Sequence, residues 1–422
     1  MHLAQTIEIH PNPKTEQVMS NLAKITNGLY NTSIYENRKR YEDEKKFCFY
    51  QELFDRLKDN ELYKLLPVHS AQAVLQKADG SIKSFISLYK KGLKPEFPHY
   101  HKKDVEWLVP YKYDQIKLKK NKITLPMSME YRRQTGISYI SFKIPKIRYK
   151  GEIKYLELFK IEGKWKASLI FDVQEKENQE KENQQTQKKD NLYIDMGIRN
   201  LATIFDGKKA TIYSGGIVSA NNQYKDKNVA KIQETLATHK LKSSESKREF
   251  ARKTRVRNKQ AINAMTTKIV ETAKEERKGI IIGNLSTIRD VTKFSRYANQ
   301  KIGQWEFGEI ARQLEYKAKI EGIMFKKVSE RDTSKTCSLC GRQEKGRVCR
   351  GLYRCKLYKK QFNADANGAL NISKMYLRIP LSEGSGIGVV DALANPAVFH
   401  WNEHEWLCEN PSIREAISAV NS

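Results

Sequence analysis

The sequence predicts a multidomain α+β protein, and three observations carry that prediction. Short, alternating apolar segments at residues 3–9 and 105–173 flank a long block with helical periodicity. A polar, repetitive stretch at residues 174–190 then separates this half of the chain from a second half. The second half opens with a buried apolar strand that ends in Asp195, and it returns far downstream to a helix that contains Asp365.

The first half is predicted to be a β domain with a helical insertion. Residues 1–10 alternate as a strand does, and prolines stop that strand. Residues 11–104 form the helical lobe, with helical blocks at 14–46, 51–66 and 68–89. Residues 105–173 are β-rich, and we expect them to form a small β-barrel together with residues 1–10.

The second half is predicted to be an α/β domain that is interrupted once. Residues 174–190 contain no apolar residue and form a flexible linker. Residues 191–332 and 361–376 make up the α/β domain, and residues 333–360 are inserted into it as a cysteine-containing module. Residues 377–422 are rich in glycine at their start and show little periodicity, so we expect a poorly ordered tail.

The charge of the chain indicates a polyanionic partner. There are 77 Lys and Arg against 49 Asp and Glu, which gives a net charge of +28, and the basic residues are spread over the whole chain. Nucleic acid is the partner that this excess favours, because each neutralised phosphate releases condensed counterions. A predicted basic helix is the strongest local signal, and the alternative for it is a solvated face. Its candidate contacts are Lys247, Arg248, Arg252, Lys253, Arg255 and Arg257.

Three sequence features indicate the cellular compartment: no membrane span, no secretion signal and clustered cysteines. No apolar stretch approaches the length of a membrane span, and the first residues lack the layout of a secretion signal. Four of the six cysteines fall between Cys337 and Cys355, which favours metal binding in a reducing compartment over a disulfide framework. We therefore expect a cytoplasmic protein, associated with the nucleoid, that has no membrane partner.

Asp195 and Asp365 predict a divalent-metal site. A single acid at the end of a strand is weak evidence, because many such residues are turn formers. Two carboxylates from opposite ends of one domain favour Mg²⁺, which takes oxygen ligands, and paired metals can hold the attacking and leaving oxygens of a phosphodiester.

These features together resemble the TnpB family of transposon-encoded RNA-guided nucleases and their relatives, the miniature type V CRISPR effectors. The resemblance covers residues 1 to about 376, is specific from residue 192 onward and is looser before it. The motifs that carry it are Tyr193-Ile194-Asp195-Met196-Gly197 with its continuation to Ala202, Gln304-Trp305-Glu306-Phe307, Tyr316-Lys317-Ala318, residues 333–341, residues 363–371, His69-Ser70-Ala71-Gln72 and Lys94-Pro95-Glu96-Phe97-Pro98.

The resemblance implies a specific architecture and specific partners. The β-barrel would be a wedge domain, the helical insertion a recognition lobe, the α/β domain an RNase H-like RuvC domain, and the cysteine module a zinc ribbon. The partners would be a guide RNA and a complementary double-stranded DNA target, with base pairing reading the sequence. Asp195 and Asp365 would be the first and third acids of the nuclease.

The sequence departs from this family at two places. The second acid should be a Glu at the end of the central strand, but the strand ends with Gly283-Asn284-Leu285; Asp290, Glu330 and Asp332 are candidates to replace it. The second half of the zinc ribbon should be Cys-x-x-Cys, but Tyr358 follows Cys355 at that spacing. The ligands would then be Cys337, Cys340 and Cys355 with Cys349 as the fourth, and the alternative is a ribbon of free thiols.

Three functions are compatible with the sequence. The first is an RNA-guided DNA-binding protein whose nuclease is inactive and which acts as a transcriptional repressor. The second is an active Mg²⁺-dependent RNA-guided DNA endonuclease with a substitute acid. The third is a nucleic-acid-binding protein that uses no guide.

Overall fold

The chain divides into two compact units, Met1–Gln174 and Glu175–Ser422, and each is described by itself. The computed structural model describes residues 1–103, 105–149, 151–161, 163–173, 191–241, 243–285, 295–343, 346–349, 351–385 and 387–409. The predicted linker at residues 174–190 lies outside this described part. None of the described helices has the length and apolar character that a membrane span needs.

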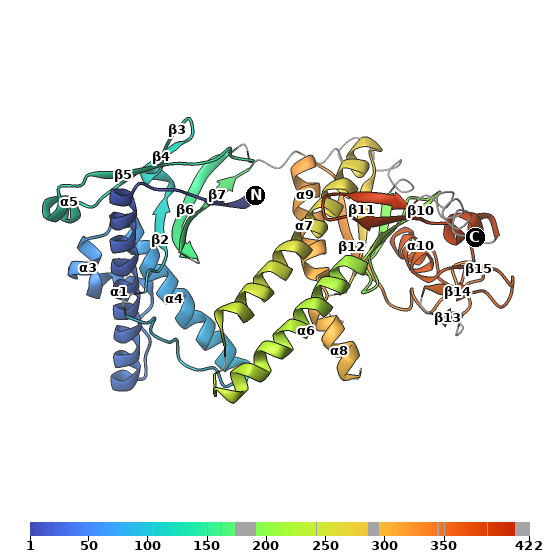
Figure 1. The fold of residues 1–422 in the computed structure, drawn as a ribbon, viewed down its shortest axis with the longest axis horizontal. Coiled ribbons are helices and arrows are strands. Elements are labelled where there is room, and N and C mark those ends of the chain that lie inside the picture. Colours follow the sequence, from blue (N-terminus) through green and yellow to red (C-terminus); the bar gives the residue numbers. More distant parts are fainter. Residues whose placement is uncertain are drawn as a thin grey trace. The chain divides into compact units, whose positions relative to one another are not determined.

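Helices are inserted after the first strand of the N-terminal unit, as the sequence predicts (Figure 1). Strand β1 (His2–Glu8) is followed by helices α1 (Pro13–Glu44), α2 (Tyr50–Leu57), α3 (Glu61–Lys64) and α4 (Val68–Lys90). Asn12 caps α1 by accepting a hydrogen bond from the Thr15 amide at 2.8 Å, and Pro13 occupies the first turn, where no amide donor is required. The remaining elements are β2 (Val109–Lys112), a 3-10 turn (Tyr113–Gln115), β3 (Lys117–Lys119), β4 (Lys122–Pro126), α5 (Met129–Thr135), β5 (Tyr139–Lys143), β6 (Glu152–Ile161) and β7 (Lys164–Asp172).

The strands of this unit form two sheets, which differs from the single barrel that we expected. One sheet has the order β1-β7-β6-β2, and the other has the order β3-β4-β5. Strand β1 joins the first sheet by pairing antiparallel with β7, so the pairing of residues 3–9 with the later strands is confirmed. Both sheets and the helices share one apolar core. A helical face covers the apolar side of the strands here, so the sheet does not need to close on itself to bury that side.

The C-terminal unit is built on a seven-stranded mixed sheet with the order β12-β11-β8-β9-β10-β16-β17. Its strands are β8 (Asn191–Asp195), β9 (Asn200–Phe205), β10 (Ala210–Ser214), β11 (Gly279–Asn284), β12 (Phe325–Ser329), β16 (Ala397–Trp401) and β17 (Trp406–Glu409). Its helices are α6 (Gly216–Thr238), α7 (Glu245–Glu275), α8 (Arg296–Gln304), α9 (Phe307–Glu321), α10 (Ala364–Leu377), a 3-10 turn (Ile387–Val389) and α11 (Val390–Ala394).

Alternate residues of the central strands face two different layers. Leu192 and Ile194 of β8 pack in one cluster with α7 and α9, whereas Tyr193 packs in another with α10 and the cysteine module. Strand β11 repeats the pattern, because Ile280 and Ile282 face α7 and α9 while Ile281 faces α10. The period of two therefore places Asp195 and Gly283 on the α10 side of the sheet.

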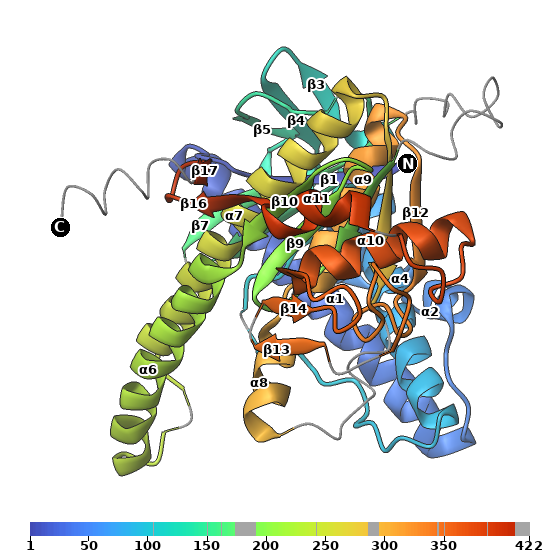
Figure 2. The same ribbon diagram turned by 90° about the vertical axis from the view of Figure 1, so that its right-hand side faces the viewer.

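The region after residue 376 is more ordered than we expected. Strand β16 pairs parallel with β10 through Thr211↔Ala397 to Tyr213↔Phe399, and β17 pairs antiparallel with β16 (Figure 2). Trp406 is 5% exposed and packs in the apolar cluster that contains α7 and α9. Its indole N–H donates to the Ala261 carbonyl of α7 at 3.0 Å. The aromatic residues of β16 and β17 thus extend the sheet, although this part of the sequence shows no helical periodicity. Residues 410–422 lie outside the described part.

Candidate functional site

Asp195 is the last residue of β8, beside the end of β11. Strands β8 and β11 are parallel with Ile194 opposite Ile282, so the next residues, Asp195 and Gly283, are neighbours at the carboxyl ends of the strands. Gly368 of α10 faces Asp195, and a Cβ at Gly368 would overlap the Asp195 carboxylate. The glycine in this buried helix therefore makes room for the acid.

Asp365 lies in the first turn of α10 and reaches the same edge of the sheet. Asn363 caps α10 by accepting hydrogen bonds from the amides of Asp365 at 2.9 Å and Ala366 at 3.1 Å. The Asp365 carboxylate accepts a 2.7 Å hydrogen bond from the side-chain amide of Asn200, at the start of β9. This contact, which the sequence did not indicate, holds Asp365 toward the β8–β9 connection.

Two buried asparagines of α10 attach the first residues of the cysteine module. Asn367 accepts a 2.8 Å hydrogen bond from the Ser338 amide and donates to the Thr336 carbonyl at 2.9 Å. Asn371 donates to the carbonyls of Thr333 and Thr336, both at 2.8 Å. The motif at residues 363–371 therefore contains the helix cap Asn363 and the acid Asp365. It also contains Gly368, which leaves space for Asp195, and the two asparagines that attach the cysteine module.

The side chain of Glu330 lies over Gly283, at the strand end where the sequence led us to expect a second acid. Val328 of β12 pairs with Gly283 of β11, and Glu330 lies two residues further along, just past the end of β12. A Cβ at Gly283 would overlap the carboxylate of Glu330, so this side chain fills the space that a longer residue at 283 would take. The absence of a side chain at Gly283 lets an acid from the neighbouring strand reach across β11 toward Asp195.

The environment of Glu330 disfavours the charged form of its carboxyl group. Burial, with the nearby Asp195 charge as a second cause, raises the pKa of Glu330 to about 8. Its buried Oε1 has no hydrogen-bond partner in the described residues. A buried carboxylate oxygen without a donor suits a cation, which would remove both the repulsion from Asp195 and the cost of burial.

Asp332, a second candidate replacement, does not share this position. Asp332 forms ion pairs with Arg331 at 3.8 Å and Lys335 at 3.5 Å, which direct its carboxylate toward exposed cations. Asp290 lies outside the described residues.

Three different elements bring Asp195, Glu330 and Asp365 to this edge of the sheet: the end of β8, the end of β12 and the start of α10. Among the described residues, three metal-binding atoms come within 4.8 Å of one another only in the cysteine cluster. In two-metal sites the ions are about 3.5–4 Å apart, so the carboxylates are spread around them and need not converge on one point. The oxygen-only donor set fits Mg²⁺, which prefers carboxylate and water ligands.

Cys337, Cys340 and Cys355 come together in the inserted module, as predicted. Their sulfur atoms lie within 4.8 Å of one another, and Cys337 and Cys355 are buried. Burial, with hydrogen bonds to the other two thiols as a further cause, raises the pKa of Cys337 to about 12. The soft thiolates fit zinc, for which they would be the ligands. The side chain of Cys349 lies outside the described part.

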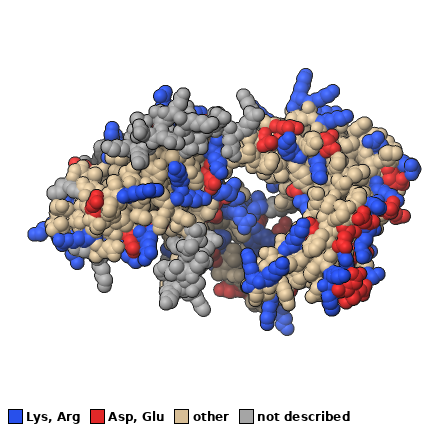
Figure 3. All heavy atoms as spheres, turned by 180° about the vertical axis from the view of Figure 1, so that it is seen from behind, with Lys and Arg blue, Asp and Glu red and all other residues tan. Residues whose placement is uncertain are grey.

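The predicted basic helix is α7, and its cations divide between several faces. Arg248, Arg252 and Arg255 are exposed and spaced by four and three residues, so they share one face of the helix. Lys247 is half-buried, Lys253 forms a 2.8 Å ion pair with Glu249, and Arg257 is exposed on another side. Figure 3 shows Lys and Arg spread over the visible face of the protein, with Asp and Glu in smaller groups.

Comparison with known proteins places two segments of the chain in described families. Residues 172–289 match the family described as "Probable transposase", and residues 307–372 match the family described as "Cas12f1-like, TNB domain". The chain is 33% identical over 124 residues to a CRISPR-associated endodeoxyribonuclease Cas12f2 of Micrarchaeota archaeon (strain CG1_02_47_40), which is 26% of this chain and 22% of that protein.

A second relative and one solved structure agree with these matches. The chain is 25% identical over 112 residues to the TnpB-like protein MJ0751 of Methanocaldococcus jannaschii, covering 26% of this chain and 40% of that protein. The alignments thus span less than half of each relative. A cryo-EM structure of a Cas12f1-sgRNA-target DNA complex shares the fold, with a TM-score of 0.61, 15% identity and coverage of 88% of this chain and 98% of that chain. Residues 172–289 and 307–372 therefore match these two families, and the relatives are named Cas12f2 and TnpB-like, which confirms the resemblance that the sequence motifs indicated.

Proposed function

We propose that this protein is an RNA-guided, Mg²⁺-dependent DNA endonuclease of the TnpB and Cas12f type, in which Glu330 takes the place of the missing second acid. The observation that carries this proposal is the Glu330 carboxylate, which lies over Gly283 and beside Asp195. A chain that had lost its nuclease site would have no need to bury an acid next to another acid, because that arrangement costs stability.

A different structural feature positions each of the three carboxylates. Asp195, at the end of β8, has room because Gly368 has no side chain. Asp365 is oriented by the Asn200 amide, and Glu330 brings an oxygen that has no donor among the described residues. Bound Mg²⁺ would supply an activated water and stabilise the charge that develops on the phosphodiester.

Guide RNA and target DNA are the partners that the charge and the relatives support. The net charge of +28 and the arginine face of α7 favour long phosphate backbones. The solved structure with the same fold is named as a complex with a guide RNA and target DNA. Base pairing would then read the sequence, while α7 would hold the backbone without reading bases. Such an activity would take place at the prokaryotic nucleoid.

A second candidate function rests on the same strand end. Gly283 and Asn284 stand where the family has acidic residues, which favours a protein that binds its target, leaves it intact and represses transcription. The two candidates differ only in whether Glu330 can serve as a metal ligand.

Cleavage of a guide-matched plasmid in Mg²⁺ separates the candidates. The protein, co-purified with its RNA, is expected to cut, and Asp195→Ala and Glu330→Gln are each expected to lower the rate by about 100-fold or more, because they remove ligands of the metals. Binding that depends on the guide without any cutting would support the repressor. Binding that is indifferent to the guide would support a general nucleic-acid-binding protein.

Moving the acid from Glu330, after β12, to position 283 on β11 tests the proposed role of Glu330 most directly. Gly283→Glu alone is expected to lower cleavage, because its side chain overlaps Glu330. Adding Glu330→Ala removes that overlap and is expected to restore part of the activity that either single change removes. Unchanged cleavage in Glu330→Gln would overturn the proposed role of Glu330, provided that the melting temperatures of the variants show that they are folded.

A further inference from the structure

The cysteine module contains two loops with the same backbone design. In the first loop, the Cys337 sulfur accepts a hydrogen bond from the Cys340 amide, and the Cys337 amide donates to the Arg342 carbonyl at 3.0 Å. The residue after Cys340, Gly341, has a positive φ of 72°. An antiparallel bridge between Thr336 and Gln343 closes the loop.

The second loop repeats each of these features, with Tyr358 in place of a cysteine. The Cys355 sulfur accepts a 3.4 Å hydrogen bond from the Tyr358 amide, and the Cys355 amide donates to the Lys360 carbonyl at 2.9 Å. The residue after Tyr358, Lys359, has a positive φ of 52°. The pairing of Arg354 with Gln361 between β14 (Leu352–Arg354) and β15 (Gln361–Asn363) closes the loop at the same spacing.

This correspondence identifies Tyr358 as the structural counterpart of Cys340. Two such loops facing each other would supply four ligands if each contained two cysteines. Here the second loop keeps the backbone of a metal-binding loop and has lost its second sulfur.

The backbone of Cys349 lies on the strand before the second loop. It belongs to β13 (Arg347–Cys349) and pairs with Leu352, three residues before Cys355. Leu352 begins β14, so the backbone of Cys349 lies opposite the end of that strand that is farther from Cys355. The second loop itself, which begins at Cys355, contains no cysteine at the position of Tyr358.

We propose that the module binds zinc through three thiolates only, those of Cys337, Cys340 and Cys355, and that the fourth coordination position, on the Tyr358 side, is open to an exchangeable ligand such as water. Cys337 and Cys355 are buried, whereas Tyr358 is 36% exposed and its neighbour Leu357 is 48% exposed, so solvent reaches the loop that lacks the sulfur. Zinc sites that keep an open position hold three protein ligands in this way.

The charge around the cluster also suits three thiolates. Lys374 of α10 is 4% exposed and donates to the carbonyls of Ser338 at 2.9 Å and Glu383 at 2.6 Å. Its ammonium group lies close enough to Cys337 and Cys340 to interact with their charges. A zinc ion with three thiolates carries one excess negative charge, and the Lys374 side chain is a buried amine on the α10 side of the cluster.

Cobalt substitution of the full chain tests this proposal without reference to nuclease activity. The protein is stripped of metal and titrated with Co²⁺, because the intensity of the sulfur-to-cobalt absorption follows the number of bound thiolates. Tyr358→Cys is expected to raise that absorption by about a third, since a fourth thiolate joins three. Cys355→Ser is expected to lower it by about a third for the converse reason.

Cys349→Ser and Tyr358→Phe are the matched controls, and both are expected to leave the spectrum unchanged. In the zinc form, Tyr358→Cys is expected to slow the transfer of zinc to a competing chelator by an order of magnitude or more. Loss of absorption in Cys349→Ser would show that Cys349 is the fourth ligand, and a changed spectrum in Tyr358→Phe would show that the phenol is the ligand. Either result, or a wild-type chain that binds no Co²⁺, overturns the proposal.

Discussion

At the scale of single residues, the candidate site depends on two glycines whose missing side chains leave space for acids. Gly283 leaves room for Glu330, and Gly368 leaves room for Asp195. Neither position has the positive φ that would require glycine for backbone reasons. Glycine is therefore needed at both positions because a carboxylate lies close to the Cα atom. A larger residue there would displace the carboxylate and would not strain the backbone.

Gly368→Ala is expected to damage the site although alanine is the better helix former. The added Cβ overlaps the Asp195 carboxylate, and a displacement of this kind costs about 100-fold in rate. Plasmid cleavage and the melting temperature measure the effect. Gly308→Ala in α9 is the control, because no atom lies within 4 Å of its added Cβ. It should keep full activity and add up to about 1 kcal/mol of stability, and equal behaviour of the two variants would refute the overlap.

The stability of the metal-free protein is expected to fall as pH rises, because of Glu330. Its folded pKa of about 8 lies above the ordinary value of 4.5, so the folded state binds more protons than the unfolded state between these values. That contribution is present at pH 4.5 and is lost progressively toward pH 8. Calorimetry in a chelator should show a smaller fall in melting temperature from pH 5 to pH 8.5 for Glu330→Gln, whereas Asp332→Asn should keep the wild-type fall.

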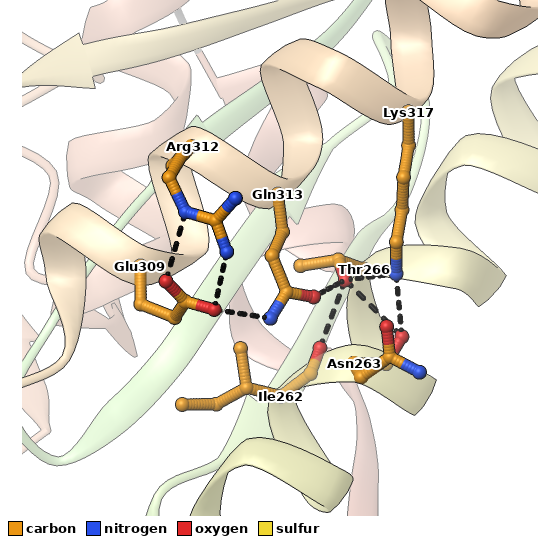
Figure 4. Close-up of polar contacts among 7 residues, drawn as sticks. All are labelled: Ile262, Asn263, Thr266, Glu309, Arg312, Gln313 and Lys317. Atoms are coloured by element: carbon orange, nitrogen blue, oxygen red, sulfur yellow. Dashed lines mark hydrogen bonds and ion pairs between the residues drawn. The ribbon is translucent and has the colours of Figure 1, made fainter. Parts of the chain in front are cut away.

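At the scale of the elements, helices α7 and α9 are held to each other by polar contacts as well as by apolar packing. Figure 4 shows α9 joined to α7 by a chain of hydrogen bonds, in which Gln313 links Glu309 to Thr266. The Lys317 ammonium donates to the Asn263 carbonyl at 2.8 Å and to the hydroxyl of Thr266 at 2.7 Å. Burial lowers the pKa of Lys317 to about 8. The motif Tyr316-Lys317-Ala318 is thus explained by helix packing.

The hairpin of β16 and β17 is expected to stabilise the α7 layer. Trp406→Ala removes a buried indole and its hydrogen bond to Ala261, which should cost about 3–5 kcal/mol in the free energy of unfolding. Leu407→Ala, on the same strand but 48% exposed, should cost no more than about 0.5 kcal/mol. Urea denaturation followed by circular dichroism measures both. Similar small costs for the two variants would show that the hairpin does not support α7.

At the scale of the whole molecule, part of the excess positive charge lies on the exposed arginine face of α7. Helices α6 and α7 run side by side, joined by a 3.0 Å hydrogen bond from Asn221 to Asn258, and they extend away from the sheet (Figures 1 and 2). The exposed arginines lie on the half of α7 that begins near Glu245, where fewer of its residues are buried.

The arginine face of α7 is expected to contribute to the salt dependence of binding to guide RNA and DNA. Arg248→Gln with Arg255→Gln should lower the slope of log affinity against log salt by up to about 0.9 for each phosphate that the variant no longer neutralises. The control is Lys274→Gln at the other end of α7, where Lys274 is paired with Glu321 at 2.8 Å. Binding titrations at several salt concentrations measure the slopes, and an unchanged slope in the double variant would remove α7 from the interface.

The sequence by itself determined which elements form and which residue types carry the chemistry. Periodicity predicted the long helices and the central strands, and spacing predicted that Cys337, Cys340 and Cys355 come together, because these signals are local in the chain. The nuclease roles of Asp195 and Asp365 remain predictions. Only the tertiary structure decided what fills the gap at Gly283 and which residue matches Cys340. Glu330 reaches Asp195 across a neighbouring strand, and Tyr358 matches Cys340 through backbone hydrogen bonds. Such relations depend on strand register and loop geometry, which no stretch of sequence contains alone.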